Sequence, residues 1–194
     1  MKLLHIDSSA LGAHSVSRDL SAAIVAAWKR REPGLKVQYR DLAAEQLPHW
    51  MPVADAADAV ARDGGALLEE FLAADIVVIG APMYNFSIPS QLKAWIDRIV
   101  IAGKTFRYGA TGVEGLAGGR KVIIASARGG FYGAESGRVD FDFQEAYLRH
   151  VFGFIGVTDI EFVRAEGVGI SPEQRAKSVN DAHAAIDARL PVAA

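Results

Sequence analysis

Short apolar runs recur along the chain and predict five β-strands, over residues 3–6, 36–40, 76–79, 121–125 and 159–163. Most of these runs are rich in β-branched residues, which favour extended structure. The run at 76–79 is apolar at every position, which is typical of a central strand buried on both faces. A parallel sheet would supply such a position.

Segments with helical spacing separate the runs. Leu20, Ile24 and Trp28 recur every four residues, and Pro33-Gly34 ends that helix. Similar apolar stripes predict helices around residues 67–72, 92–100 and 147–155. A closing helix is predicted over 172–190, with Ser171 as its N-cap and Pro172 in its first position.

This alternation predicts an α/β fold in which a five-stranded parallel sheet carries helices on both faces. We expect one domain over residues 1–194, because neither a repeat nor a linker interrupts the pattern. Residues 42–65 fit the alternation poorly, and we interpret them as a partly ordered excursion near the mouth of the fold.

Composition narrows the range of functions. The net charge is −2, so the chain lacks the excess of basic residues that is typical of proteins that bind nucleic acid or an anionic membrane. The chain has no cysteine, which excludes a disulfide framework, a thiolate metal site and an attacking thiol. The five histidines show no metal-ligand spacing, so no metal is expected. No run is long enough for a signal peptide or membrane span, and the expected location is the cytoplasm.

The loop after the first strand is rich in serine. It contains Ser9, Ser15 and Ser17 and leads into a helix, whose N-terminal N–H groups favour an anion. The triphosphate-binding motif and the dinucleotide-binding G-x-G-x-x-G are both missing, so a terminal monophosphate suits the loop better. An ordinary serine N-cap would explain the same residues, and this segment alone leaves both interpretations open.

Two further loops follow the third and fourth strands. The first places Met83, Tyr84 and Phe86 beside Asn85 between two prolines, which suits a flat ring, although a plug of apolar side chains is the alternative. The second reads Arg128-Gly129-Gly130, where the glycines would allow close approach to a ligand and Arg128 would act as a cation or stack. Taken alone, this second loop is better explained by a plain turn. Ligands of open α/β sheets bind at the carboxyl ends of the strands, so the three loops together indicate FMN.

Two consecutive runs make the pattern specific: Pro82-Met83-Tyr84-Asn85-Phe86 and Pro89-Ser90-Gln91-Leu92-Lys93. They resemble the signature of the FMN-dependent, NAD(P)H-linked azoreductases and quinone reductases of flavodoxin-like fold. The similarity spans almost the whole chain and includes the serine loop, residues 103–108, 115–116, 128–130, 153–156 and 165–167.

The resemblance implies a three-layer flavodoxin-like fold and a homodimer with one FMN per subunit and active sites at the interface. It implies ping-pong transfer, in which NADH or NADPH reduces the flavin and a quinone or azo compound then takes the electrons. The flavin would carry the chemistry without a catalytic side chain. The phosphate would be bound by Ser9, Ser15, Val16 and Ser17. The ring and ribityl chain would be surrounded by Met83, Tyr84, Asn85, Phe86, Ala127, Arg128, Gly129 and Gly130. Phe86 and Tyr108 would form aromatic walls of the substrate pocket.

The chain departs from the family pattern in three places. Ala127 stands where serine is frequent, and Val16 stands where a polar residue is common, so each position lacks a side-chain donor. Residues 131–143 also match poorly, and we expect this segment to shape the substrate pocket. Two alternatives remain beside the reductase: an electron carrier without turnover, and a hydrolase that uses Ser8 or Ser9.

Overall fold

The sheet contains five parallel strands. A computed structural model describes residues 1–51 and 59–190 of the chain. The strands are β1 (Lys2–Asp7), β2 (Lys36–Asp41), β3 (Ile76–Pro82), β6 (Lys121–Ala127) and β7 (Asp159–Ala165), in the order β2-β1-β3-β6-β7. Every neighbouring pair is parallel. The α/β fold and all five predicted strands are confirmed.

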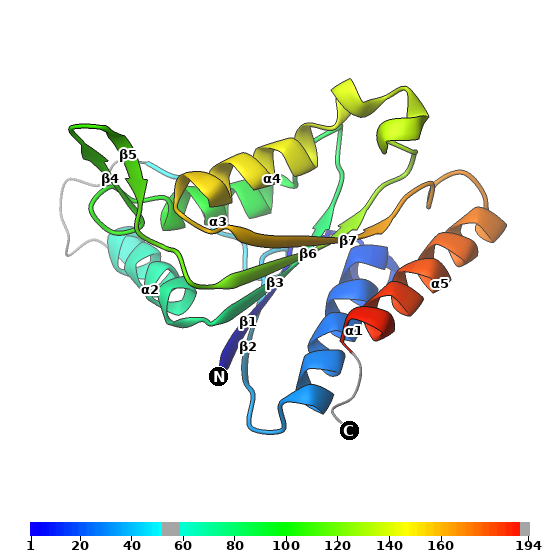
Figure 1. Ribbon diagram of the computed structural model, residues 1–194, viewed down its shortest axis with the longest axis horizontal. Helices are drawn as coiled ribbons and strands as arrows, with labels where there is room; N and C mark the ends of the chain where they lie inside the picture. Colours follow the sequence, from blue (N-terminus) through cyan, green and yellow to red (C-terminus); the bar gives the residue numbers. More distant parts are fainter. Residues whose placement is uncertain (52–58, 191–194) are drawn as a thin grey trace.

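Helices cover both faces of the sheet, which makes three layers (Figure 1). One face carries α1 (Val16–Arg31) and α5 (Pro172–Arg189), and the other carries α2 (Ala59–Ala73), α3 (Ser90–Ile99) and α4 (Phe143–Phe154). The predicted start of α5 is confirmed: Ser171 accepts a hydrogen bond from the N–H of Gln174, and Pro172 follows it. In the described ranges, every helix is too short or too polar to cross a membrane.

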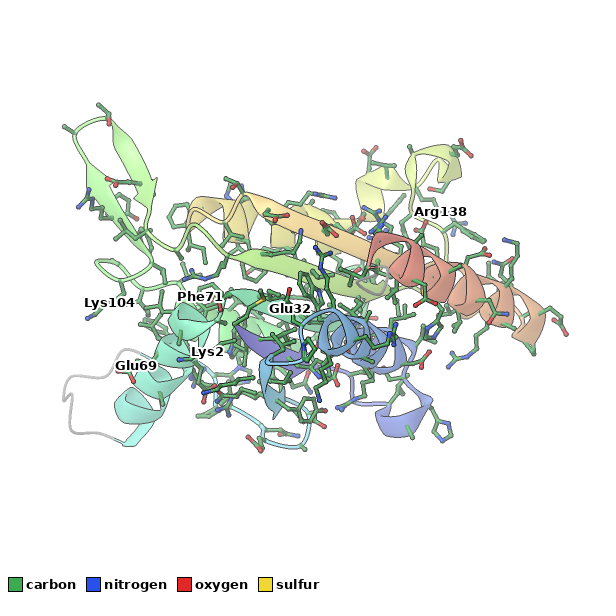
Figure 2. All side chains as sticks on the ribbon, turned by 60° about the horizontal axis from the view of Figure 1, so that its bottom comes forward. Lys2, Glu32, Glu69, Phe71, Lys104 and Arg138 are labelled. Atoms are coloured by element: carbon green, nitrogen blue, oxygen red, sulfur yellow. The ribbon has the colours of Figure 1, made fainter. Side chains whose placement is uncertain are left out.

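Strand β3 divides the interior into two apolar clusters. Its residues are buried throughout, and successive side chains point to opposite faces. Ile76 and Val78 pack with α1 and α5, whereas Val77 and Ile79 pack with α2, α3 and α4. Phe71 of α2 is fully buried in the second cluster (Figure 2). This two-sided burial explains the uninterrupted apolar run in the sequence.

A small hairpin, which the sequence analysis did not predict, precedes β6. It pairs β4 (Phe106–Gly109) with β5 (Gly112–Gly115) in antiparallel register. Its base packs against the end of α4 at Gly115, where a Cβ atom would lie 2.2 Å from the backbone nitrogen of Gly156. Only glycine permits such a contact, and the hairpin is fixed to the body of the molecule there.

The expectation for residues 42–65 was partly wrong. Helix α2 begins at Ala59, so the irregular stretch that follows β2 is shorter at its C-terminal end, and Leu42 at its start is fully buried. The alanines of this region favour helix, and the apolar stripe beginning at Leu67 gives that helix a face to bury. Residues 52–58 lie outside the described part of the chain.

Candidate functional site

The three loops of interest lie at one edge of the sheet, at the carboxyl ends of β1, β3 and β6. Strand β1 is paired with β2 on one side and β3 on the other, so the order of strands along the sheet reverses at this position. Open α/β sheets bind ligands outside such a reversal. The topology therefore brings the serine loop, the aromatic loop and the glycine loop to one rim.

The three serines of the first loop are buried at the N-terminus of α1. Ser15 is the N-cap, since its Oγ accepts a hydrogen bond from the N–H of Arg18. The Oγ atoms of Ser15 and Ser17 lie 3.1 Å apart. Val16 points instead into the apolar cluster beneath α1, so only its backbone is available to a ligand. Clustered hydroxyls at a helix N-terminus suit an anion.

Tyr84 connects the aromatic loop to the serine loop. Its hydroxyl lies 3.2 Å from the Oγ of Ser9 and accepts a hydrogen bond of 3.2 Å from the N–H of Ala10. The sequence analysis assigned Tyr84 to the ring site, and this link to the serine loop was not foreseen. The two loops are therefore held at a fixed separation.

The aromatic loop contains a two-residue turn in an unusual conformation. Tyr84 and Ser87 exchange backbone hydrogen bonds of 2.9 and 3.0 Å. The central residues Asn85 and Phe86 have φ values of 47° and 71°. Such values are uncommon for asparagine and costly for phenylalanine, and this kind of strain concentrates at binding sites. Phe86 is 47% exposed at the rim as a result of this turn.

The glycine loop is fastened to its neighbours by its carbonyl groups. Those of Arg128, Gly129 and Gly130 accept hydrogen bonds of 3.1, 3.1 and 2.9 Å from the chain segment that follows β7. The carbonyl of Ala127 accepts another, of 2.8 Å, from the N–H of Met83. The glycine loop thus lies directly beside the aromatic loop, as the sequence analysis expected of one binding site.

The side chain of Arg128 is turned inward. It is 1% exposed and contacts Ser126, Asp142, Glu145 and Glu166. Burial of a cation requires such partners. The guanidinium group therefore supports the rim from below, and the N–H and carbonyl groups of Arg128 are bonded to Ala165 and Val168. The carboxylates were missed as partners because they come from α4 and β7, far away in the sequence.

A broad cleft adjoins the glycine loop. It has a volume of about 880 Å³ and is lined by Gly130, Glu166, Ile170 and several residues of the 131–143 segment. This segment forms two short 3₁₀ turns, Ala134–Ser136 and Val139–Phe141. Glu166 accepts a hydrogen bond of 2.8 Å from the N–H of Tyr132, so the segment is tied to the carboxylate that also faces Arg128.

Tyr108 lies far from this rim within one chain. It is 75% exposed on β4, next to Phe106, which packs on Phe154 at the end of α4. The opposite end of α4 meets the rim, where the N–H of Phe143 donates to the carbonyl of Phe86. A helix of 12 residues is about 18 Å long. Figure 2 likewise shows Lys104, just before β4, and Arg138, beside the rim, at opposite ends of the molecule.

Comparison with known proteins agrees with this arrangement. A family model described as flavodoxin-like fold matches residues 1–190. The chain belongs to this family. Among its flavodoxin-like relatives is the FMN-dependent NADH:quinone oxidoreductase 1 of Xanthomonas axonopodis pv. citri, 57% identical over 96% of this chain and 95% of the relative. The FMN-dependent NADH:quinone oxidoreductase of Methylocella silvestris is 56% identical over 96% and 97%.

Solved flavodoxin-like structures are also similar. An azoreductase from Bacillus anthracis str. Sterne superposes with a TM-score of 0.89 at 28% identity, covering 98% of each chain. An FMN-dependent NADH-azoreductase from Bacillus anthracis str. Ames Ancestor, solved in complex with FMN, gives a TM-score of 0.85 at 26% identity, over 97% of this chain and 99% of that one. The resemblance stated from the sequence is confirmed.

The geometry does not favour a serine hydrolase. The Oγ of Ser8 donates to the carbonyl of Gly80 at 2.7 Å, and that of Ser9 pairs with Tyr84. Within residues 1–51 and 59–190, no histidine is hydrogen-bonded to either serine, and the nearest buried one, His5, bonds to Ser21. An attacking serine needs such a base. The same described residues contain no cluster of His, Asp and Glu suited to a metal ion.

Proposed function

We propose that this protein is an FMN-dependent NADH:quinone oxidoreductase that also reduces azo compounds. The convergence of the serine, aromatic and glycine loops on one rim carries the proposal. Relatives at 55–57% identity that bear this name over nearly the full chain support it. NADH follows the names of those relatives, and its availability in the cytoplasm makes that compartment the proposed location.

The donors at the rim fit FMN. Hydroxyl groups of Ser9, Ser15 and Ser17, together with the N-terminus of α1, would hold the phosphate. The turn at Asn85-Phe86 and the Ala127–Gly130 loop would hold the ring and ribityl chain. Bound FMN would supply hydride chemistry, by which NADH is oxidised to NAD⁺ and a quinone gains two electrons and two protons.

The protein's own residues position and shield the reactants. The strained turn presents Phe86 to solvent as one wall of a pocket. The hydrogen bonds between Tyr84 and Ser87, and the one from the N–H of Phe143 to the carbonyl of Phe86, hold that wall in place. Backbone N–H groups of Asn85, Phe86, Gly129 and Gly130 would offer dipoles that do not reorganise during the reaction. Hydride transfer needs no side-chain nucleophile, and water would supply the one proton that the quinone needs besides the hydride.

The pocket requires a second subunit. Phe86 and Tyr108 were expected to line one pocket, and the length of α4 separates them within one chain. We infer a homodimer in which the exposed Tyr108 of the partner subunit stands opposite Phe86. Exposed apolar groups around the rim, including Phe131, Phe141 and Phe143, are suited to such an interface.

The 131–143 segment is proposed to set the choice of electron acceptor. It lines the cleft beside Gly130, and its position depends on the Glu166 contact to Tyr132. Quinones and azo dyes differ in length and width, so changes in this segment would alter their relative rates without removing the flavin.

Steady-state oxidation of NADH with a small quinone tests the proposal. The FMN-loaded protein should turn over many times per flavin, and NADPH in parallel would report the preference between reductants. An electron carrier would oxidise NADH poorly and pass single electrons to a protein partner. Failure to bind FMN at all would reject both interpretations.

A further inference from the structure

Arg18 follows the serine loop directly, yet its side chain turns away from the clustered hydroxyls. Its Nε and one terminal nitrogen donate to the carbonyl of Ser9 at 3.1 and 2.8 Å. Its two terminal nitrogens also donate to the carboxylate of Asp41, at 2.7 and 2.6 Å. A further donation of 3.1 Å reaches the hydroxyl of Tyr39. All three nitrogen atoms of the guanidinium group are engaged with the protein.

Asp41 is itself held firmly at the end of β2. Its Oδ1 accepts hydrogen bonds of 3.0 and 3.2 Å from the N–H groups of Ala43 and Ala44. The Arg18 and Asp41 side chains are only 16% and 22% exposed. A bidentate ion pair with this little exposure has a fixed orientation and resists screening.

Ser9 is the residue of the serine loop that the Arg18–Asp41 ion pair contacts. Its carbonyl is held from one side by Arg18, and its Oγ lies beside the hydroxyl of Tyr84 on the other. The rotation of the peptide unit between Ser9 and Ala10 is therefore set by both contacts. The N–H of Ala10 belongs to this peptide unit, and the Ser9 side chain comes immediately before the unit in the chain.

We propose that Arg18 and Asp41 form a positioning pair that sets the affinity for the FMN phosphate by fixing Ser9, without a direct contact between Arg18 and the phosphate. The inference rests on the proposed function, because it takes the serine loop to be the phosphate site. Within the Ser15-Val16-Ser17-Arg18 run, the Arg18 side chain therefore supports the structure of the site, and the hydroxyl and amide groups bind the phosphate.

Tyr39, which lies on the same face of β2 as Asp41, makes further contacts that support the ion pair. The hydroxyl of Tyr39 donates to Asp7 at 3.1 Å, and Asp7 accepts a further hydrogen bond of 2.7 Å from Ser21 of α1. Arg18 thus joins a partly buried polar network that links β1, β2 and α1. Such a network keeps the guanidinium group from swinging toward a ligand.

The two roles of an arginine respond differently to lysine. Lysine keeps the charge but loses the planar, two-pronged geometry. A positioning pair is therefore broken by R18K and by D41N alike, whereas a direct charge contact survives R18K and is released by D41N. Arg40 and Glu70 form a matched control: their ion pair is also bidentate, at 3.0 and 2.6 Å, and starts from the same strand.

The experiment compares FMN with riboflavin, which lacks the phosphate. Protein loaded with either flavin is diluted serially, and free flavin is followed by its fluorescence. R18K and D41N should each weaken FMN roughly tenfold while leaving riboflavin unchanged, and R18K/D41N should be no weaker than the single variants. D41E should recover part of the loss. R40K and E70Q should keep the wild-type ratio of the two affinities.

Three results would overturn the proposal. Wild-type affinity in R18K, with tighter binding in D41N, would mean that Arg18 contacts the phosphate. Equal loss for FMN and riboflavin would mean a general structural role. Additive losses would mean that the two residues act separately. If R18K does not fold, D41N and D41E still decide between these results, and wild-type protein that binds no FMN would reject the proposed function itself.

Discussion

At the scale of single residues, the site depends on small polar groups whose positions are fixed by larger neighbours. Ser15 and Ser17 are buried beside each other at the start of α1, and Ser9 is held between Arg18 and Tyr84. Three hydroxyls before a helix are a local pattern, so the sequence alone can propose these serines as phosphate ligands, and that role stays a prediction. The partners that orient them come from β2 and the aromatic loop, and no local pattern reveals them.

Loss of the serine hydroxyls should weaken FMN. Ser17→Ala removes one hydroxyl donor to a charged phosphate, which costs about 1 kcal/mol or more of binding free energy. Ser15→Ala should lose a similar amount of binding and also about 1 kcal/mol of unfolding free energy, because Ser15 caps α1. Flavin titrations and urea unfolding separate the two effects. Unchanged FMN affinity in the double variant would place the phosphate elsewhere.

The contacts of Asp41 predict that the unfolding free energy depends on pH in the acidic range. Hydrogen bonds from Arg18, and then those from Ala43 and Ala44, lower the pKa of this carboxyl below its ordinary value of 3.8. A depressed folded-state pKa contributes stability that is complete above the unfolded-state pKa and is lost as pH falls through the folded value. Asp41→Asn should therefore lower the unfolding free energy at neutral pH and flatten its decline below about pH 4. Urea unfolding across this range checks the sign, and parallel curves for both proteins would contradict it.

At the scale of elements, the alternation of apolar runs was enough to predict the sheet, because a strand that is buried on both faces has an uninterrupted run of apolar residues in the sequence. The β4–β5 hairpin has no comparable apolar run: its residues are mostly exposed and include three glycines, and it is fixed by a contact between two glycines. The sequence predicts the Asn85-Phe86 segment as a ligand loop, but residue preference does not predict its left-handed backbone, with φ values of 47° and 71°.

The glycine contact gives a prediction for the hairpin. Gly156 has φ +94° and packs on the Gly115 backbone, so Gly156→Ala should strain this joint and cost about 1–3 kcal/mol of unfolding free energy. Quinone turnover should fall with it, because the hairpin carries Tyr108, while FMN affinity should stay near wild type. Gly153→Ala is the control, since a Cβ atom there meets nothing within 4 Å. Wild-type turnover and stability in Gly156→Ala would show that the hairpin position is unimportant.

At the scale of the whole molecule, the proposed homodimer would build each site from two chains. Strand β4, which carries the exposed Tyr108, lies at the opposite end of the molecule from the carboxyl ends of β3 and β6 (Figure 1). The family resemblance implies that both aromatic residues, Phe86 and Tyr108, line the pocket, but the sequence could not show that α4 keeps them apart in one subunit. That separation is what turns the expected homodimer into a requirement of the proposed reaction.

Mixed dimers test this requirement. Phe86→Ala and Tyr108→Ala should each lower quinone turnover strongly as separate proteins. If the two variants are unfolded, mixed and refolded together, half of the dimers are mixed, and each mixed dimer has one intact pocket. Activity should then rise to about a quarter of wild type. A mixture that stays as inactive as its components would place Tyr108 outside the pocket.

The central claim is that the protein uses bound FMN to move electrons from NADH to a quinone. Its most direct test is the visible spectrum of the FMN-loaded protein without oxygen. We expect NADH to bleach the flavin absorbance and a stoichiometric quinone to restore it. A flavin spectrum that NADH leaves unchanged, or a bleached spectrum that quinone does not restore, would contradict the account.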